Sequence, residues 1–74
     1  MEKMDIEIKT EYIKLDQLLK YAGIVDSGAN GKQCIKEGNI KLNDQIETQR
    51  GKKIYPGDRV EAFGQILIQV KEES

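Results

Sequence analysis

The sequence predicts an α+β fold in which two short helices pack on a small, mainly antiparallel sheet of about four to five strands. Three observations predict this class. Apolar and charged residues alternate near the N-terminus, apolar residues recur at helical spacing from residue 15, and short alternating runs separated by turn residues follow residue 39. Since 74 residues with 38% apolar content can build only one small core, we expect a single domain over residues 1–74.

Residues 4–12 predict a strand at the edge of the sheet. Methionine and isoleucine alternate there with acidic and basic residues, which is the period of a strand buried on one face. From Leu15 the apolar spacing becomes helical, Asp16 falls in the first turn, and Gly23 is predicted to end this first helix as a C-terminal cap.

A second helix is predicted from its N-cap, Ser27, to about residue 37, with Gly38 closing it. Gly28 and Gly31 lie inside it, and a glycine there costs roughly 1 kcal/mol relative to alanine, less in the first turn. Either tight contact between the helices or close approach of a ligand backbone must justify these glycines.

The C-terminal half predicts a hairpin and two further strands. Residues 40–42 and 45–47 are expected to pair across a tight turn at Asn43, because asparagine and aspartate tolerate the positive φ of such turns. Beyond it we expect a loop at 48–53, a turn at 55–58, strands at 59–62 and 65–70 joined around Gly64, and a frayed tail at 71–74.

The composition excludes several kinds of chemistry. One cysteine cannot form an internal disulfide, and without histidine the chain lacks the usual ligands of a zinc site and the usual general acid–base group. We therefore expect no metal, no cofactor and no enzymatic activity, and Cys34 is expected to be a small buried apolar residue. The chain also lacks the run of about 20 apolar residues that a membrane span needs, and its first residues lack the apolar core of a signal peptide. These absences predict a cytoplasmic protein without membrane contact, and we expect it to be a monomer.

The net charge of −1 conceals a basic middle segment. Residues 14–60 carry nine Lys and Arg against six Asp and Glu, whereas both ends of the chain are acidic. Anion binding depends on the potential within about one Debye length, so the middle segment matters more than the sum.

The cations of this segment fall into two groups. Lys32 and Lys36 are four residues apart and share a helix face, close to the free N–H groups of a helix start at Ser27. Arg50, Lys52 and Lys53 surround a glycine in the predicted loop. This cluster is either a phosphate-binding loop or a solvated loop that serves solubility.

The order and approximate spacing of several short motifs resemble the S-four-type RNA-binding domain, also called the alpha-L motif. They are Lys14-Leu15-Asp16, Leu18-Leu19, Ala22-Gly23, Ser27, Ile35, Gly38, Ile40, Leu42-Asn43 and Pro56-Gly57-Asp58. The resemblance covers residues 13–62 and is strongest to small stand-alone bacterial members, whose serine-glycine helix start and Arg-Gly-basic-Lys loop match this chain.

This resemblance implies a non-catalytic module that recognises structured RNA, ribosomal or transfer RNA, by phosphate contacts and shape, with the ribosome as one setting. The implied RNA-binding residues are Lys14, Ser27, Gly28, Lys32, Lys36, Lys41, Asn43, Arg50, Lys52 and Lys53. Asp16 is expected to fix the helix start or a basic side chain. Many members carry arginine at the position of Gly28, so the 50–53 loop is expected to supply much of the positive charge.

A second function from another class is a protein-interaction module that docks on a ribosome or on a replication or repair complex. The acidic strand Asp5-Ile6-Glu7-Ile8 would repel phosphate and attract a basic protein surface.

Overall fold

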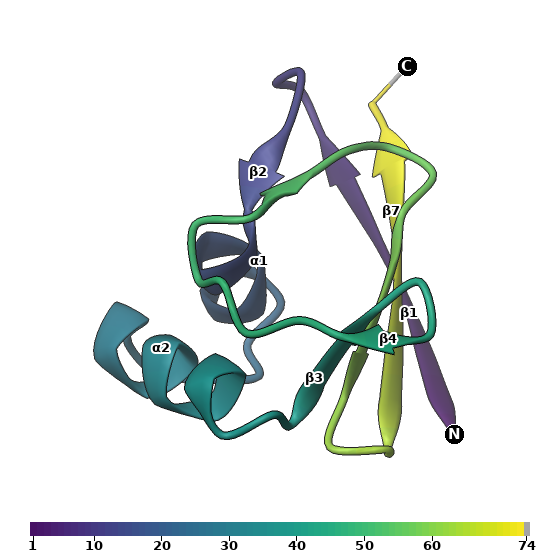
Figure 1. Ribbon diagram of the computed structural model, residues 1–74. Coiled ribbons are helices and arrows are strands. Elements are labelled where there is room, and N and C mark those ends of the chain that lie inside the picture. Colours follow the sequence, from purple (N-terminus) through teal and green to yellow (C-terminus); the bar gives the residue numbers. More distant parts are fainter. Residues whose placement is uncertain (74) are drawn as a thin grey trace.

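The computed structural model describes residues 1–73 and contains two sheets and two helices (Figure 1). In chain order the elements are β1 (Glu2–Ile8), β2 (Ile13–Lys14), α1 (Leu15–Tyr21), α2 (Gly28–Lys36), β3 (Ile40–Leu42), β4 (Gln45–Ile46), β5 (Lys53–Ile54), β6 (Arg59–Ala62) and β7 (Ile66–Glu72). Five strands form one sheet in the order β1-β7-β6-β3-β4, and β2 pairs with β5 in a separate ladder. The predicted α+β class is confirmed.

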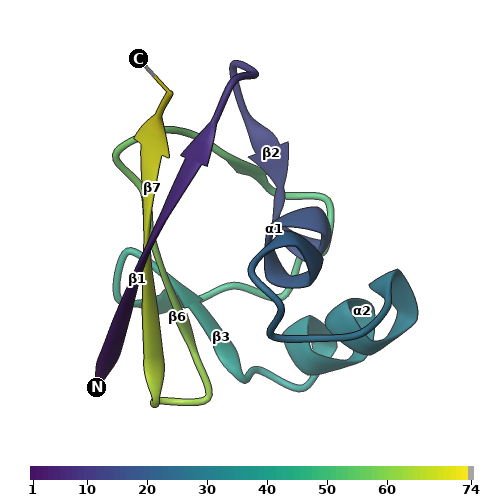
Figure 2. The ribbon, with the colours of Figure 1, turned by 180° about the vertical axis from the view of Figure 1, so that it is seen from behind.

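The helices and the β2–β5 ladder lie together on one side of the five-stranded sheet (Figures 1 and 2). The core lies between these layers and consists of buried apolar side chains from both: Ile8, Leu15, Leu18, Leu19, Ile35, Ile40, Ile54, Val60, Ala62, Ile68 and Val70. Burial of each large side chain contributes about 1.5–3 kcal/mol, so this contact between layers holds the fold together.

The N-terminal strand is at the edge of the sheet, as predicted, but its predicted bounds of 4–12 are wrong. β1 pairs parallel with β7 and ends at Ile8, after which the chain turns toward the second ladder. The predicted tail is also wrong at its start, because Lys71 and Glu72 continue β7 beside β1. Lys71 Nζ donates to Asp5 Oδ2 across this pair at 3.1 Å. The last residue of that tail, Ser74, lies outside the described residues.

Both helices end as predicted. Gly23 has φ +76° just beyond α1, and Gly38 has φ +81° just beyond α2, which is the left-handed conformation that glycine adopts without strain. Ser27 is the N-cap of α2, and its Oγ accepts a hydrogen bond from the Asn30 N–H at 3.2 Å. Cys34 is half-buried at the edge of the core rather than buried, because it lies on the flank of α2.

The two glycines of α2, Gly28 and Gly31, have different surroundings. A Cβ on Gly31 would lie 3.4 Å from Asp16 O and 3.4 Å from Val25 Cγ2, so α2 passes close to the start of α1 at this residue. A Cβ on Gly28 would meet nothing within 4 Å. Packing against α1 therefore limits the space at Gly31, whereas no packing contact explains Gly28.

The hairpin and the following turn are confirmed. Asn43 and Asp44 have φ of +50° and +73° between β3 and β4, although β4 ends at Ile46, one residue earlier than predicted. In the turn at 55–58, Asp58 Oδ2 accepts a hydrogen bond from the Tyr55 N–H at 2.8 Å. The predicted loop at 48–53 is wrong at its end, where Lys53 begins β5. A strand of two residues is too short to show an alternation of apolar and polar residues in the sequence.

Candidate nucleic-acid interface

The basic loop between β4 and β5 is fixed by its backbone to the start of α1. The Leu15 N–H donates to Lys52 O at 2.9 Å, and the Asp16 N–H donates to Arg50 O at 3.1 Å. A turn closed by the bond from Lys52 N to Gln49 O, 3.1 Å, shapes the loop itself. The loop carbonyls thus satisfy helix N–H groups that a short helix leaves unpaired, while the loop's cationic side chains remain exposed.

Asp16 completes the start of α1, as expected. Its Oδ1 accepts a hydrogen bond from the Gln17 N–H at 2.8 Å, so the first three N–H groups of α1 all have partners within the protein. No N–H of these three is available to a phosphate. The anion-binding capacity of this region must therefore come from cationic side chains.

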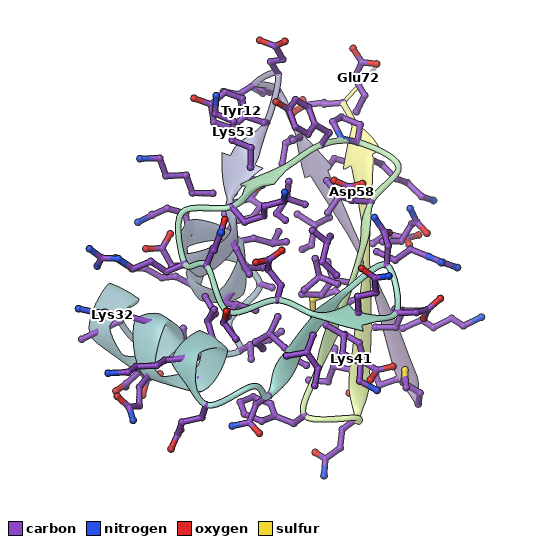
Figure 3. The ribbon with its side chains drawn as sticks, in the orientation of Figure 1. Tyr12, Lys32, Lys41, Lys53, Asp58 and Glu72 are labelled. Atoms are coloured by element: carbon purple, nitrogen blue, oxygen red, sulfur yellow. The ribbon has the colours of Figure 1, made fainter. Side chains whose placement is uncertain are left out.

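The backbone of Asp16 also joins the two groups of cations. Its N–H bonds to Arg50, and its carbonyl oxygen packs against Gly31 of α2. Lys32 follows Gly31 directly, so the loop and α2 are held on the same side of the molecule (Figures 1 and 3). The structure thus brings together the two halves of the site that the sequence predicts.

The β2–β5 ladder adds a second cationic pair. Lys14 is directly opposite Lys53 in the antiparallel register, and Ile13 is opposite Ile54. Like charges at opposed positions of a ladder are destabilising, and both lysines are exposed. The register thus places two exposed cations side by side next to the start of α1.

Ion pairing separates the two sides of the protein. Four cations are paired with carboxylates at 3.1–3.9 Å, and all four lie on the five-stranded sheet or at its strand ends: Lys9 with Glu73, Lys41 with Glu61, Arg59 with Asp44, and Lys71 with Asp5. Within residues 1–73, no ion pair includes Lys14, Lys32, Lys36, Arg50, Lys52 or Lys53. Most of the positive charge on the five-stranded sheet is thus paired with carboxylates, Lys3 of β1 being the exception among residues 1–73, whereas the cations around α1, α2 and the loop are not.

Lys41 does not join the other predicted residues. It alternates on β3 with Ile40, whose side chain is in the core, and therefore lies on the sheet face away from the helices. Its Nζ is 3.8 Å from Glu61 Oε2, on the neighbouring strand. The prediction that Lys41 shares one RNA-binding surface with the helices is not supported by this placement.

Ser27, Gly28 and Asn43 occupy structured positions. Ser27 caps α2, and Gly28 follows it at a position where an added Cβ would meet nothing within 4 Å. Asn43 joins two turns, since its Nδ2 donates to Asp58 Oδ1 at 3.2 Å and its Oδ1 accepts from the Arg59 N–H at 2.9 Å. Asp58 is thus a turn residue, as predicted.

A hollow of about 590 Å³ lies between the β3–β4 turn and the basic loop. Its lining residues are Leu42, Asn43, Gln49, Gly51, Lys52, Lys53, Tyr55 and Asp58. It therefore places Asn43 beside two cations of the loop, although Asn43 itself is held by hydrogen bonds to the neighbouring turn.

Two tyrosines also belong to this region, although the sequence did not indicate them as site residues. The ring centroids of Tyr12 and Tyr55 are 5.8 Å apart with an interplanar angle of 49°, and Lys53 Nζ lies 4.8 Å from the centroid of Tyr12 (Figure 3). Tyr12 lies two residues before Lys14, and Tyr55 lies two residues after Lys53, so all four share a ladder face. Only the pairing of β2 with β5 brings the two tyrosines together. Each of these strands has two residues, which is too short for the sequence to show their pairing.

No helix among residues 1–73 is long and apolar enough to cross a membrane. Over the same range, no group of three or more cysteine and carboxylate side chains is placed to hold a metal ion.

Two packed helices, a basic loop tied to the first of them and a five-stranded mixed sheet define a small α+β domain of the S-four type. A family model described as the S4 domain matches residues 6–71, so the chain belongs to the S4 domain family, as its motifs predicted. The match extends beyond residues 13–62 and includes most of β1 and β7.

Small proteins of two kinds of bacteria are similar to this chain. A Bacillus subtilis (strain 168) protein named "Probable ribosome maturation protein RlbA" is 42% identical over 65 residues, which cover 85% of this chain and 92% of that protein. An Escherichia coli (strain K12) protein named "Putative RNA-binding protein YbcJ" is 38% identical over 56 residues, which cover 76% of this chain and 80% of that protein. Because the matched segments are most of each relative, these relatives are small stand-alone members of the family.

Proposed function

We propose that this protein is a non-catalytic RNA-binding module that holds structured RNA through its phosphates and its shape. The observation that carries this proposal is the segregation of unpaired cations. Among residues 1–73, seven cations around α1, α2 and the basic loop make no ion pair, whereas Lys3 is the one unpaired cation on the five-stranded sheet. The seven are Lys14, Lys20, Lys32, Lys36, Arg50, Lys52 and Lys53.

The chemistry of the surface favours phosphate over base recognition. Lysine offers a point charge, and Arg50 can make two parallel hydrogen bonds to one phosphate. Contacts of this kind fix the position of an RNA without reading its bases. The names of the two relatives, a ribosome maturation protein and an RNA-binding protein, support RNA as the partner and ribosomal RNA as the first one to test, ahead of transfer RNA.

The same proposal includes a monomer that acts in the cytoplasm and has no catalytic activity of its own. The chain contains no histidine, so the commonest general acid–base residue is missing. If RNA chemistry accompanies binding, we expect a partner protein to supply it.

The proposal is tested by binding at increasing salt. Fluorescence anisotropy with a labelled ribosomal RNA fragment and with a transfer RNA, between about 50 and 200 mM salt, should give a steep linear decrease of log affinity with log salt. Replacing Arg50, Lys52 and Lys53 together by alanine should reduce the slope by about 2–3, because each phosphate contact contributes about 0.7–0.9.

A matched control removes three cations that belong to the five-stranded sheet or to its strand ends. Lys9, Lys41 and Lys71 are each ion-paired to a carboxylate, and their triple alanine variant changes the net charge by the same amount. It should keep the wild-type salt slope. An affinity independent of salt, or equal losses in both triple variants, would rule out a localised phosphate interface.

The position of β1 favours one alternative, a protein-interaction module. β1 is at the edge of the sheet, so one row of its main-chain groups is open to pairing, and its exposed Asp5 and Glu7 would suit a basic partner. A pull-down from nuclease-treated lysate separates the two functions. A partner that survives RNA removal and is lost when Asp5 and Glu7 become lysine supports this alternative.

A further inference from the structure

The outer face of the β2–β5 ladder carries two aromatic rings between two lysines. Ile13 of β2 and Ile54 of β5 point toward the core. Because side chains alternate along an extended chain, Lys14 and Lys53 point outward, and so do Tyr12 just before β2 and Tyr55 just after β5. We propose that this face binds an unpaired RNA base by stacking on Tyr55. The inference rests on the RNA-binding function proposed above and adds a preference for single-stranded positions.

Of the two tyrosines on the outer face of the ladder, Tyr55 has the ring that is available for stacking with a base. Tyr12 is half-buried, with Lys53 Nζ 4.8 Å from its centroid and the Tyr55 ring at 5.8 Å. Tyr55 is 42% exposed. Tyr12 therefore supports Tyr55 from one side, and the remaining surface of Tyr55 is open to solvent. Aromatic side chains with cationic neighbours provide such stacking sites because every base has a π face.

The adjoining hollow supplies the other groups that a nucleotide needs. Tyr55, Gln49, Lys52 and Lys53 contribute to its lining, and its volume of about 590 Å³ is within the range of ligand pockets. Among residues 1–73, the Gln49 side-chain amide makes no hydrogen bond, so it can both donate to and accept from a base edge. The two lysines are placed to bind the phosphates of the same nucleotide.

This site distinguishes RNA forms that the phosphate surface does not. Bases within a duplex are paired and stacked on their neighbours, so only a bulge, a loop or an end can offer a free base to Tyr55. A purely structural role, in which the tyrosines cover the edge of the core, would give no such preference.

The test uses two RNA hairpins of the same stem sequence, one fully paired and one with a single bulged 2-aminopurine. The wild-type protein should bind the bulged hairpin about 5- to 150-fold more tightly, the range expected for one stacked base. Because the chain has three tyrosines and no tryptophan, quenching of tyrosine emission together with 2-aminopurine emission reports stacking directly.

Tyr55→Leu should remove this preference, and Tyr55→Phe should retain it, because phenylalanine keeps the ring. Tyr21→Leu is the matched control, since Tyr21 is 66% exposed on α1 and lies outside the ladder face. All three variants should keep the wild-type salt slope. If Tyr55→Leu does not fold, Tyr12→Leu replaces it, and loss of the preference is again expected.

The outcomes separate this inference from the function on which it rests. Equal affinity of the wild type for both hairpins, or a preference that survives the leucine variant, refutes the stacking site and leaves the phosphate interface standing. Failure to bind either hairpin at about 50 mM salt refutes the RNA-binding proposal itself.

Discussion

Replacing Lys14 by glutamate should stabilise the free protein and weaken its binding to RNA. Lys14 is directly opposite Lys53 in the β2–β5 ladder, and it is also the N-cap of α1, where its side chain makes no capping hydrogen bond. Glutamate would convert a repulsive cross-strand pair into an attractive one. It would also place a negative charge at the positive end of a helix.

The two effects give the size of the stability gain. An opposed charge pair changes stability by roughly 0.2–1 kcal/mol, and a charge at a helix end by roughly 0.3–1 kcal/mol. Since both lysines are exposed and screened by salt, we expect a sum of about 0.5–1.5 kcal/mol. In a domain of this size, each kcal/mol raises Tm by about 4–8 °C, so the increase should be about 2–12 °C.

RNA binding should change in the opposite direction. The variant loses one phosphate contact and gains a charge that repels phosphate, so the salt slope should fall by at least about 0.7–0.9. At low salt, the affinity should fall by about tenfold or more. A Lys14→Gln variant, which only removes the charge, should fall between the two. Tm should therefore be highest for Lys14→Glu, intermediate for Lys14→Gln and lowest for the wild type, and RNA affinity should follow the opposite order.

Thermal melts followed by circular dichroism and anisotropy titrations measure the two orders. Lys41→Glu is the control, because it replaces the Lys41–Glu61 ion pair with a like-charge pair on the opposite face. This control should lower Tm slightly and leave RNA affinity unchanged. A Lys14→Glu variant that melts below the wild type at low salt, or that binds RNA equally well, would refute the reasoning.

Three further substitutions test local features of the fold by thermal or urea unfolding. Gly28→Ala should raise the free energy of unfolding by up to about 1 kcal/mol, since its Cβ meets open space. Weaker RNA binding by the same variant would show that a ligand backbone approaches this position. Gly38→Ala should lower the free energy of unfolding by about 1 kcal/mol, because the φ of this residue is +81°. An unchanged Tm would contradict this account of the end of α2. Asp58→Ala should cost about 1–3 kcal/mol, because its carboxylate accepts from the Tyr55 N–H and from Asn43 Nδ2; a loss as small as that of a surface ion pair would be inconsistent with this role.

The sequence predicts the features that depend on nearby residues. Ser27 and Gly38 determine the ends of a helix within one turn, and Asn43 determines a hairpin turn through its own backbone preference. The parallel pairing of β1 with β7 could not be predicted, because more than 60 residues separate the paired positions, such as Met4 and Ile68. Local periodicity carries no information about which distant strand is the neighbour.

The candidate site shows the same division. The cations of the 50–53 loop were recognisable as a cluster, but their connection to α2 depends on contacts of the Asp16 backbone with Arg50 and Gly31. The sequence groups Lys41 with the helix cations, whereas the structure places it on the opposite sheet face, because its position depends on which side of the sheet the helices cover. The tyrosine pair was missed for the same reason, since its members meet only across the β2–β5 ladder.

The backbone of the basic loop also bears on whether its charges serve phosphate binding or solubility. A loop that only keeps charge in water gains nothing from a fixed conformation, whereas this loop uses the carbonyls of Arg50 and Lys52 to bind the N–H groups of Asp16 and Leu15. Ordering the loop is thus part of starting α1, and it is achieved when the protein folds rather than when a ligand binds. Because less conformational entropy remains to be lost on association, cations held in this way should bind phosphate more tightly than the same cations in a free loop. This argument favours the phosphate-binding interpretation of the Arg50 to Lys53 segment.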